Sequence, residues 1–197
     1  GVLVSTANSK ENEVVIKGLA SAHYSFNKGI STQDYPGSLM GVIALLKQTY
    51  LDAKWYASQK NPKEYNISLE AWNKLQGLPQ IMVANGILNE LRADLLGDAF
   101  GVQYILVGDG SEYQRLKELK ATNATVIVPV DFPIPFDVED PFDALNVSLA
   151  EMKHWELAPA NAALLAKQQL DFAISTQGLK NADQFWTNLR KAINRGL

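Results

Sequence analysis

The feature that most constrains the fold is a repeated alternation of short apolar segments with longer helical ones over residues 79–197. Four segments have the length and the β-branched, apolar composition of buried strands, namely 79–85, 102–107, 124–130 and 172–176. A helical segment follows each of them. Consecutive βα units are joined by right-handed connections and form a parallel sheet covered by helices, so the chain is predicted to be an α/β protein.

Two architectures satisfy this pattern, an open doubly wound sheet and a part of a (β/α)8 barrel. A whole barrel needs about 250 residues and eight strands, and the 197 residues supply about half of one. Residues 2–5 and 13–26 predict a small N-terminal β-element, with a polar stretch between them. The predicted organisation is an N-terminal β-element and linker over 1–34, and a TIM-like partial (β/α) barrel over 35–197.

The remaining helices are predicted from apolar spacing and from their end signals. A long amphipathic helix is expected over 39–58, and a short one over 69–76. Ser111 and Gln114 form a capping-box pair that predicts a helix to residue 120. Asp140 followed by Pro141 predicts a helix start after a proline-rich loop, with the helix reaching residue 155. The last helices are expected over 161–168, before the fourth of these strands, and 183–194.

Composition excludes several functions. The formal net charge is −3 and no basic run is present, so nucleic acid is not an expected partner. The chain has no cysteine, which removes thiolate metal sites, cysteine nucleophiles and disulfides. No apolar stretch approaches the ~20 residues that span a bilayer, so no membrane contact is expected and the segment is predicted to be soluble. The leading glycine and the absence of an initiator methionine suggest a piece of a longer chain.

Three segments carry a resemblance to a known family. Residues 35–49 (YPGSLMGVIALLKQT) are similar to the helix entering the middle of imidazolonepropionase-like amidohydrolases. Residues 154–165 (HWELAPANAALL) resemble the helical segment before the last barrel strand of these proteins, and residues 172–178 (FAISTQG) resemble that strand. The resemblance covers most of residues 20–197 in the family's order, and implies the second half of a metal-dependent hydrolase barrel acting on C–N bonds of cyclic amides.

The resemblance also implies where metal ligands would lie. The family holds zinc or another divalent metal with a His-x-His pair on the first strand, one histidine each on the fifth and sixth strands, and an aspartate ending the eighth. The corresponding positions here are Asn85, Gly108 and Gln177. Because none of these supplies the family's ligand, no family metal and no cofactor are expected in this chain.

Other polar residues have structural explanations beside functional ones. Gly108-Asp109-Gly110 could cradle an anion on backbone N–H groups, although a tight βα turn needs glycine equally. The acidic loop suggests calcium, but its spacing does not match an EF-hand, and solvated carboxylates with an N-cap explain it. Packing or helix capping is the expected role of His23 and His154. The loop acids are Asp131, Asp137, Glu139, Asp140 and Asp143. The four tryptophans all fall on predicted helices, where packing in the outer layer is their expected role; they are Trp55, Trp72, Trp155 and Trp186.

Three hypotheses follow. The first is a non-catalytic amidohydrolase-like segment with a structural or interaction role in a longer chain. The second is a hydrolase of C–N bonds that uses strand-end carboxylates instead of the family metal, indicated by paired carboxylates with raised pKa. The third is a small-molecule binding module, indicated by a large apolar pocket containing the amides. The candidate catalytic residues are Asp109, Asp131 and Glu156; the candidate ligand-binding residues are Asn85, Gly108, Gly110 and Gln177.

A half-barrel leaves two sheet edges without partners, which favours pairing with other strands. The expected partner is therefore the remaining half of the parent chain or a second copy in a homodimer, unless the N-terminal β-element protects the edges. By analogy with bacterial members of the family the parent protein could be exported, but the compartment stays open on the sequence alone.

Overall fold

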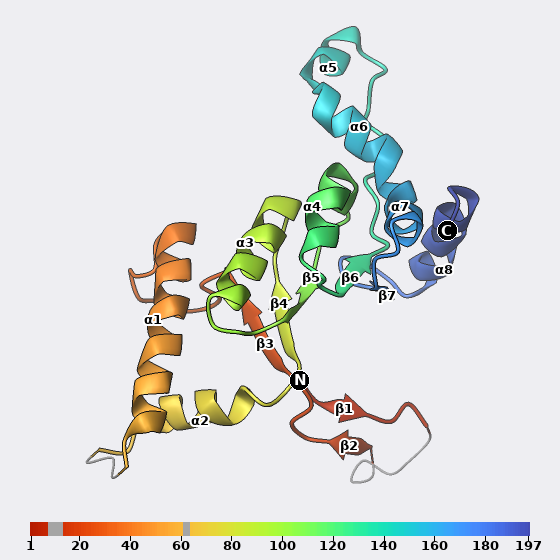
Figure 1. Cartoon of the computed structure of the whole chain (residues 1–197). Helices are drawn as coiled ribbons and strands as arrows, with labels where there is room; N and C mark the ends of the chain where they lie inside the picture. The colour runs from red at the N-terminus through yellow and green to blue at the C-terminus, as the bar shows by residue number, and fades with distance from the viewer. Residues whose placement is uncertain (8–13, 61–63) are drawn as a thin grey trace. The chain divides into compact units, whose positions relative to one another are not determined.

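The computed structural model describes residues 1–7, 14–60 and 64–197 (Figure 1). Its strands are β1 (Leu3–Val4), β2 (Val15–Lys17), β3 (Ala22–Ser25), β4 (Gln80–Val83), β5 (Tyr104–Val107), β6 (Val126–Pro129) and β7 (Phe172–Ser175). Its α-helices are α1 (Leu39–Ser58), α2 (Ile67–Leu75), α3 (Ile87–Asp98), α4 (Leu116–Ala121), α5 (Pro141–Asn146), α6 (Leu149–Leu157), α7 (Asn161–Lys167) and α8 (Asp183–Asn194). The 3-10 helices η2 (Glu112–Arg115) and η3 (Ala158–Ala160) precede α4 and α7.

The main sheet has five strands in the order β3-β4-β5-β6-β7. The β3–β4, β5–β6 and β6–β7 pairs are parallel. Successive strands are therefore neighbours in the sheet, as repeated βα units require. The predicted α/β class is confirmed, and the sequential parallel order agrees with part of a TIM-like barrel.

The sheet contains one strand more than the sequence indicated. Residues 13–26 were predicted to lie together in the N-terminal β-element, but only β2 pairs with β1, in an antiparallel sheet of two strands. The second part of the segment, β3, pairs in parallel with β4 from Ala22 opposite Gln80 to Ser25 opposite Val83. A parallel partner lies far away in sequence, so local patterning could not reveal it.

The chain divides into two compact units. The first comprises residues 1–83 and 95–105, and the second comprises residues 84–94 and 106–197. In the first unit, Tyr50 stacks on Phe100 with ring centroids 4.5 Å apart. The buried hydroxyl groups of Tyr50 and Tyr104 lie 2.6 Å apart and share a hydrogen bond. Burial raises the pKa of both tyrosines, so both stay protonated and one hydroxyl donates to the other.

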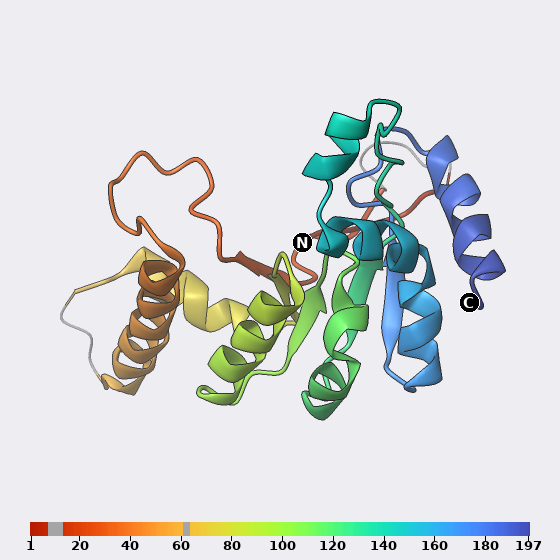
Figure 2. The same ribbon diagram turned by 90° about the horizontal axis from the view of Figure 1, so that it is seen from above.

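The core of the second unit consists of apolar side chains from strands and from the helices beside them. Figure 2 shows α4 and α7 running alongside β6 and β7, the strands that follow them. Both helices are short, and each contributes a leucine without solvent exposure, Leu119 from α4 and Leu165 from α7. The strand side chains buried here are Leu106, Val107, Val126 and Val128, followed by Val130 just past β6. This core fixes the carboxyl ends of β5 and β6, where the candidate site lies.

One predicted helix start is confirmed and another is wrong. The Asp140 side chain accepts a hydrogen bond from the Phe142 N–H at 2.8 Å with Pro141 in the first turn, which confirms that start. The Ser111–Gln114 capping box is wrong, because the Ser111 side chain makes no cap bond to the helix. Its hydroxyl donates instead to Asp109 Oδ1 at 2.6 Å. Asn146 ends α5 and Leu149 begins α6, so the single helix predicted to residue 155 is two.

A capping box is present at the start of α6. The Glu151 N–H donates to Ser148 Oγ at 3.2 Å, and the Ser148 N–H donates to Glu151 Oε2 at 2.8 Å. Among the described helices, none is both long enough and apolar enough to cross a membrane.

Candidate functional site

The turn after β5 places a carboxylate inside a loop of backbone N–H groups. Glu112 Oε1 accepts hydrogen bonds from the Asp109 N–H at 3.0 Å and from the Gly110 N–H at 3.1 Å. Gly110 has a φ of +92°, a left-handed conformation that favours glycine. A Cβ at Gly108 would overlap Glu112 Oε1, so the close approach of this carboxylate also requires glycine there. The turn therefore binds the chain's own anion.

Glu112 is held on its second oxygen as well. The side-chain amide of Asn161, the first residue of α7, donates to Glu112 Oε2. The amide oxygen of Asn161 accepts a hydrogen bond from the Tyr113 N–H at 2.8 Å. Glu112 and Asn161 are both buried, at 0% and 3% exposed. Three donors therefore hold the Glu112 carboxyl group in place, with both of its oxygens hydrogen-bonded.

A second buried carboxyl group faces the first. Glu90 lies on α3 and is 0% exposed, and neither of its oxygens has a hydrogen-bond donor in the described part of the chain. A Cβ at Gly108 would lie 3.0 Å from Glu90 Oε1 and would overlap Glu112, which places both carboxyl groups over the same glycine. Burial first, and then the negative charge of the neighbouring Glu112, raise the pKa of Glu90 to about 10.

Asp109 completes a group of three carboxyl groups. One oxygen each of Glu90, Asp109 and Glu112 lies within 4.8 Å of the other two. Asp109 is exposed, and its Oδ1 accepts from the Ser111 N–H at 3.2 Å and from the Ser111 hydroxyl. Glu90, Asp109 and Glu112 are referred to below as the carboxylate cluster. The cluster thus has two buried members and one that faces solvent.

The predicted ligand-binding residues lie at strand ends. Asn85 comes two residues after β4, Gly108 directly after β5 and Gln177 two residues after β7. Asn85 and Gln177 are exposed, and the Asn85 carbonyl accepts from Asn89 Nδ2 at 2.8 Å. Gly108 is buried and its N–H donates to the Ile127 carbonyl at 3.0 Å. The N–H groups of the Gly108–Gly110 turn are therefore used inside the chain.

The three predicted catalytic carboxylates are not gathered in one group. Asp109 joins the carboxylate cluster. Asp131 lies exposed after β6, where the loop at Gly178 packs so closely that a Cβ there would overlap it. Glu156 lies on α6 and forms an ion pair with Arg195, with Oε1 2.7 Å from Nη1.

Glu90 and Glu112 form a buried pair of carboxyl groups, and the pKa of Glu90 is raised. Both are fully buried, so a substrate could contact only Asp109 directly. General acid–base catalysis requires the acid or base within hydrogen-bond reach of the reacting group or one water away. The arrangement therefore fits a small ion better than it fits a catalytic pair acting on a cyclic amide.

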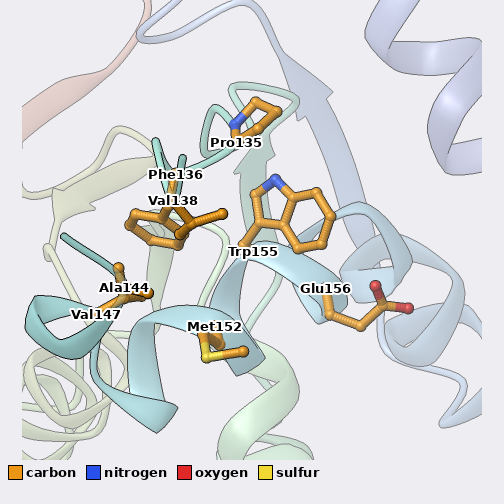
Figure 3. A pocket seen from close by; sticks show the side chains of 8 residues that line it. All are labelled: Pro135, Phe136, Val138, Ala144, Val147, Met152, Trp155 and Glu156. Atoms are coloured by element: carbon orange, nitrogen blue, oxygen red, sulfur yellow. The ribbon is translucent and has the colours of Figure 1, made fainter. Parts of the chain in front are cut away.

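An apolar pocket of about 620 Å³ lies elsewhere in the second unit. Figure 3 shows the Glu156 carboxylate at its margin, pointing away from the Phe136 ring. The lining residues are Pro135, Phe136, Val138, Ala144, Val147, Met152, Trp155 and Glu156. Neither Asn85 nor Gln177 is among them, so this pocket is not the amide-containing pocket that a binding module was expected to have.

The histidines and Trp72 make ring contacts or side-chain hydrogen bonds. The His154 ring stacks on Tyr113, and its Nδ1 lies 3.2 Å from the Tyr113 hydroxyl. His23 lies on β3 with Nε2 2.8 Å from Ser21 Oγ, and its pKa is lowered by partial burial and then by the positive N-terminus. Trp72 packs edge-on against Tyr50 at 5.0 Å. Trp55, Trp155 and Trp186 are 63%, 41% and 59% exposed, so their contribution to packing is partial.

Sequence reasoning missed three residues of the site, Glu90, Glu112 and Asn161. A signal for Glu90 was present, because it lies at helical spacing between the buried residues Ile87 and Ala93. A carboxylate in the apolar stripe of a helix is uncommon unless it is paired, protonated or bound to a metal. Glu112 follows the glycine turn by two residues, but only the folded turn shows that its side chain returns to the N–H groups.

Comparison with known proteins supports the fold. The structure is similar to that of an amidohydrolase from Thermotoga maritima MSB8, with a TM-score of 0.68 and 17% identity. The similarity covers 98% of this chain and 51% of that chain, so this chain spans about half of that protein's length. No family model matches the sequence, and no curated protein matches it. The chain therefore has an amidohydrolase-like fold over nearly its whole length.

Proposed function

We propose that this chain is one half of an amidohydrolase-like barrel, related to the imidazolonepropionase-like group, that has a structural or interaction role and lacks that family's metal-dependent hydrolysis. The observation that carries the proposal is the match over 98% of this chain to 51% of the amidohydrolase. A barrel is closed by eight strands, whereas the main sheet of the described residues has five. The proposed role is to pair with complementary βα units.

The sheet edges support this role. In the described part of the chain β3 and β7 are the outer strands of the main sheet. The Asp171 and Ser175 carbonyls accept from the Val126 and Val130 N–H groups, so residues 171, 173 and 175 face β6. Because backbone direction alternates along a strand, the Ile174 N–H faces the other side. An open row of backbone groups is a template for another strand.

The substitutions at the family's ligand positions support the loss of hydrolysis. Asn85, Gly108 and Gln177 stand where the resemblance puts two histidines and an aspartate. Position 108 has no room for a ligand side chain, because a Cβ on Gly108 would overlap Glu112. Zinc sites are built from histidine nitrogen, cysteine thiolate and carboxylate oxygen ligands, and neither asparagine, glycine nor glutamine supplies one of these.

Self-association of the 197-residue chain tests the pairing role, because in the absence of the other half a second copy is the available partner. Sedimentation velocity of the unmodified chain is expected to show a dimer. Ile174→Pro removes the outward N–H and is expected to give a monomer. Ile174→Ala loses the same side chain but keeps the N–H, and is expected to remain a dimer. A monodisperse monomer of the unmodified chain overturns the pairing role.

Elemental analysis tests the loss of metal-dependent hydrolysis separately. Protein purified without chelator is expected to contain zinc far below one equivalent. One equivalent of zinc that persists in Glu90→Gln would mean that the family's metal site survives at residues other than the carboxylate cluster, and the proposal would be wrong.

A further inference from the structure

We propose that Glu90, Asp109 and Glu112 form a binding site for a hard divalent cation of the calcium and magnesium class. The ligand set differs from that of the family's metal site, and the inference is independent of the half-barrel role. Its ligands come from a helix and a loop rather than from histidines at strand ends. One oxygen from each of the three carboxyl groups lies within 4.8 Å of the other two, a spacing that oxygen ligands around one such cation adopt.

A group of acidic residues alone would not indicate a cation, and the decisive observation concerns Glu90. This carboxyl group is 0% exposed and both of its oxygens lack a donor in the described residues. It faces Glu112 and Asp109 rather than solvent. Burying an unpartnered carboxyl group is strongly unfavourable, and buried carboxylates are normally paired or bound to metals. An unsatisfied group of this kind calls for a ligand that the chain does not supply.

The hydrogen bonds of the other two members leave lone pairs that face a cation. Glu112 Oε1 accepts two N–H donors, whereas Oε2 accepts only the Asn161 amide among the described residues. The bonds from Ser111 to Asp109 are both made to Oδ1, and Oδ2 has no hydrogen-bond donor among the described residues. No ion pair links the cluster to a described lysine or arginine. The loop and α7 therefore orient two carboxylates without neutralising them.

A bound proton is the alternative to a cation for reducing the negative charge of the carboxylate cluster, but it leaves more of the carboxyl oxygens without a partner. One proton shared by Glu90 and Glu112 makes one hydrogen bond between them. It leaves the second oxygen of Glu90 without a donor and leaves the charge of Asp109 unchanged. One divalent cation interacts with all three carboxylates. Because Asp109 is exposed, a cation can enter past it and keep part of its water shell, as magnesium in particular does.

The choice of cation follows from the ligand chemistry. All three side chains offer hard carboxylate oxygens, which suit calcium, magnesium and manganese, and the cluster contains no imidazole or thiolate that would favour zinc or copper. Three carboxylates around a small buried volume also provide the negative charge that raises affinity for a divalent ion over sodium or potassium.

Calorimetric titration of the chelator-treated 197-residue chain tests the site. Calcium chloride and magnesium chloride are added separately at pH 7.5, and at least one is expected to bind with one site per chain. Glu90→Gln and Asp109→Asn each remove one anionic ligand and are expected to weaken binding about tenfold or more. Glu118→Gln removes an exposed carboxylate on α4, and this matched control is expected to bind as the unmodified chain does.

Two results would overturn the inference. The first is the absence of saturable binding of either cation up to millimolar concentration in the folded, unmodified chain. The second is equal affinity of the unmodified chain, Glu90→Gln and Asp109→Asn, which would place the ion elsewhere. Far-UV circular dichroism of each variant verifies that it is folded. Asp109→Asn changes an exposed side chain, so it keeps the test decisive if Glu90→Gln folds differently.

Discussion

Glu90→Gln is expected to stabilise the metal-free protein, and to do so more strongly as the pH rises. Burial and the charge of Glu112 raise the pKa of Glu90 from 4.5 to about 10 in the folded state. Between pH 4.5 and about pH 10, Glu90 is therefore protonated in the folded protein and ionised in the unfolded chain. The stability present below pH 4.5 is therefore lost progressively as the pH rises, until Glu90 ionises in the folded state near its raised pKa.

The magnitude follows from proton linkage. One proton held in the folded state and released on unfolding lowers the free energy of unfolding by about 1.4 kcal/mol per pH unit. From pH 6 to pH 8 the unmodified chain should lose up to about 3 kcal/mol through Glu90 alone. Glutamine has nearly the same shape and does not titrate, so Glu90→Gln should lack this loss. Its amide can also donate a hydrogen bond to Glu112.

Urea unfolding followed by circular dichroism at pH 6, 7 and 8, in the presence of chelator, measures the effect. The quantity of interest is the difference in unfolding free energy between variant and unmodified chain, since all other titrating groups cancel in it. Glu118→Gln is the control, because hydrogen bonds from its own backbone and from Arg115 lower the pKa of Glu118, so it does not titrate above pH 6. Parallel curves for Glu90→Gln and the unmodified chain would refute a protonated, buried Glu90.

Three further outcomes are expected. Tyr104→Phe should lower the unfolding free energy by about 1–2 kcal/mol, because the buried Tyr50 hydroxyl loses its hydrogen-bond partner. The double variant Tyr50→Phe/Tyr104→Phe should recover part of this loss in urea unfolding. An equal loss in the single and double variants would contradict the hydrogen bond between the two hydroxyls. Gly108→Ala should cost about 1–3 kcal/mol by thermal unfolding, and Gly77→Ala, which meets nothing within 4 Å, should cost little; similar melting temperatures would contradict the close approach. Phe136→Asp should weaken binding of an apolar fluorophore about tenfold in a fluorescence titration, and unchanged binding would place the dye outside the pocket.

The strands and helices of the βα units could be predicted because their signals are local. Apolar runs such as 124–130 and the glycine after α3 indicate element type without knowledge of the partner. The parallel pairing of β3 could not be predicted in this way, because Ala22 and Gln80 are far apart in sequence. Local side-chain competition also decided the Ser111 cap, where Asp109 accepts the hydroxyl that a helix cap would have used.

The glycine turn of the candidate site could be predicted from the sequence, but the buried carboxyl groups beneath it could not. The glycines at 108 and 110 correctly marked a turn of special backbone geometry. The positions named from the family resemblance led to Asn85 and Gln177, which are exposed strand-end residues. The buried members of the cluster come from a helix and from the 3-10 turn. Their convergence depends on the packing of α3 and α7 around the turn, and no spacing in the sequence encodes it.

The carboxylate of Glu112 in the turn after β5 has a consequence for competition between anions. An external phosphate or carboxylate would have to displace the Glu112 carboxyl group, which is tethered only two residues from Gly110. Such a tether gives this carboxyl group an effective concentration on the order of millimolar or higher at the turn. Dilute metabolites would therefore be excluded from this loop even though its backbone geometry suits them. Displacement would also release the Asn161 amide, so vacating the loop would loosen the start of α7 at the same time.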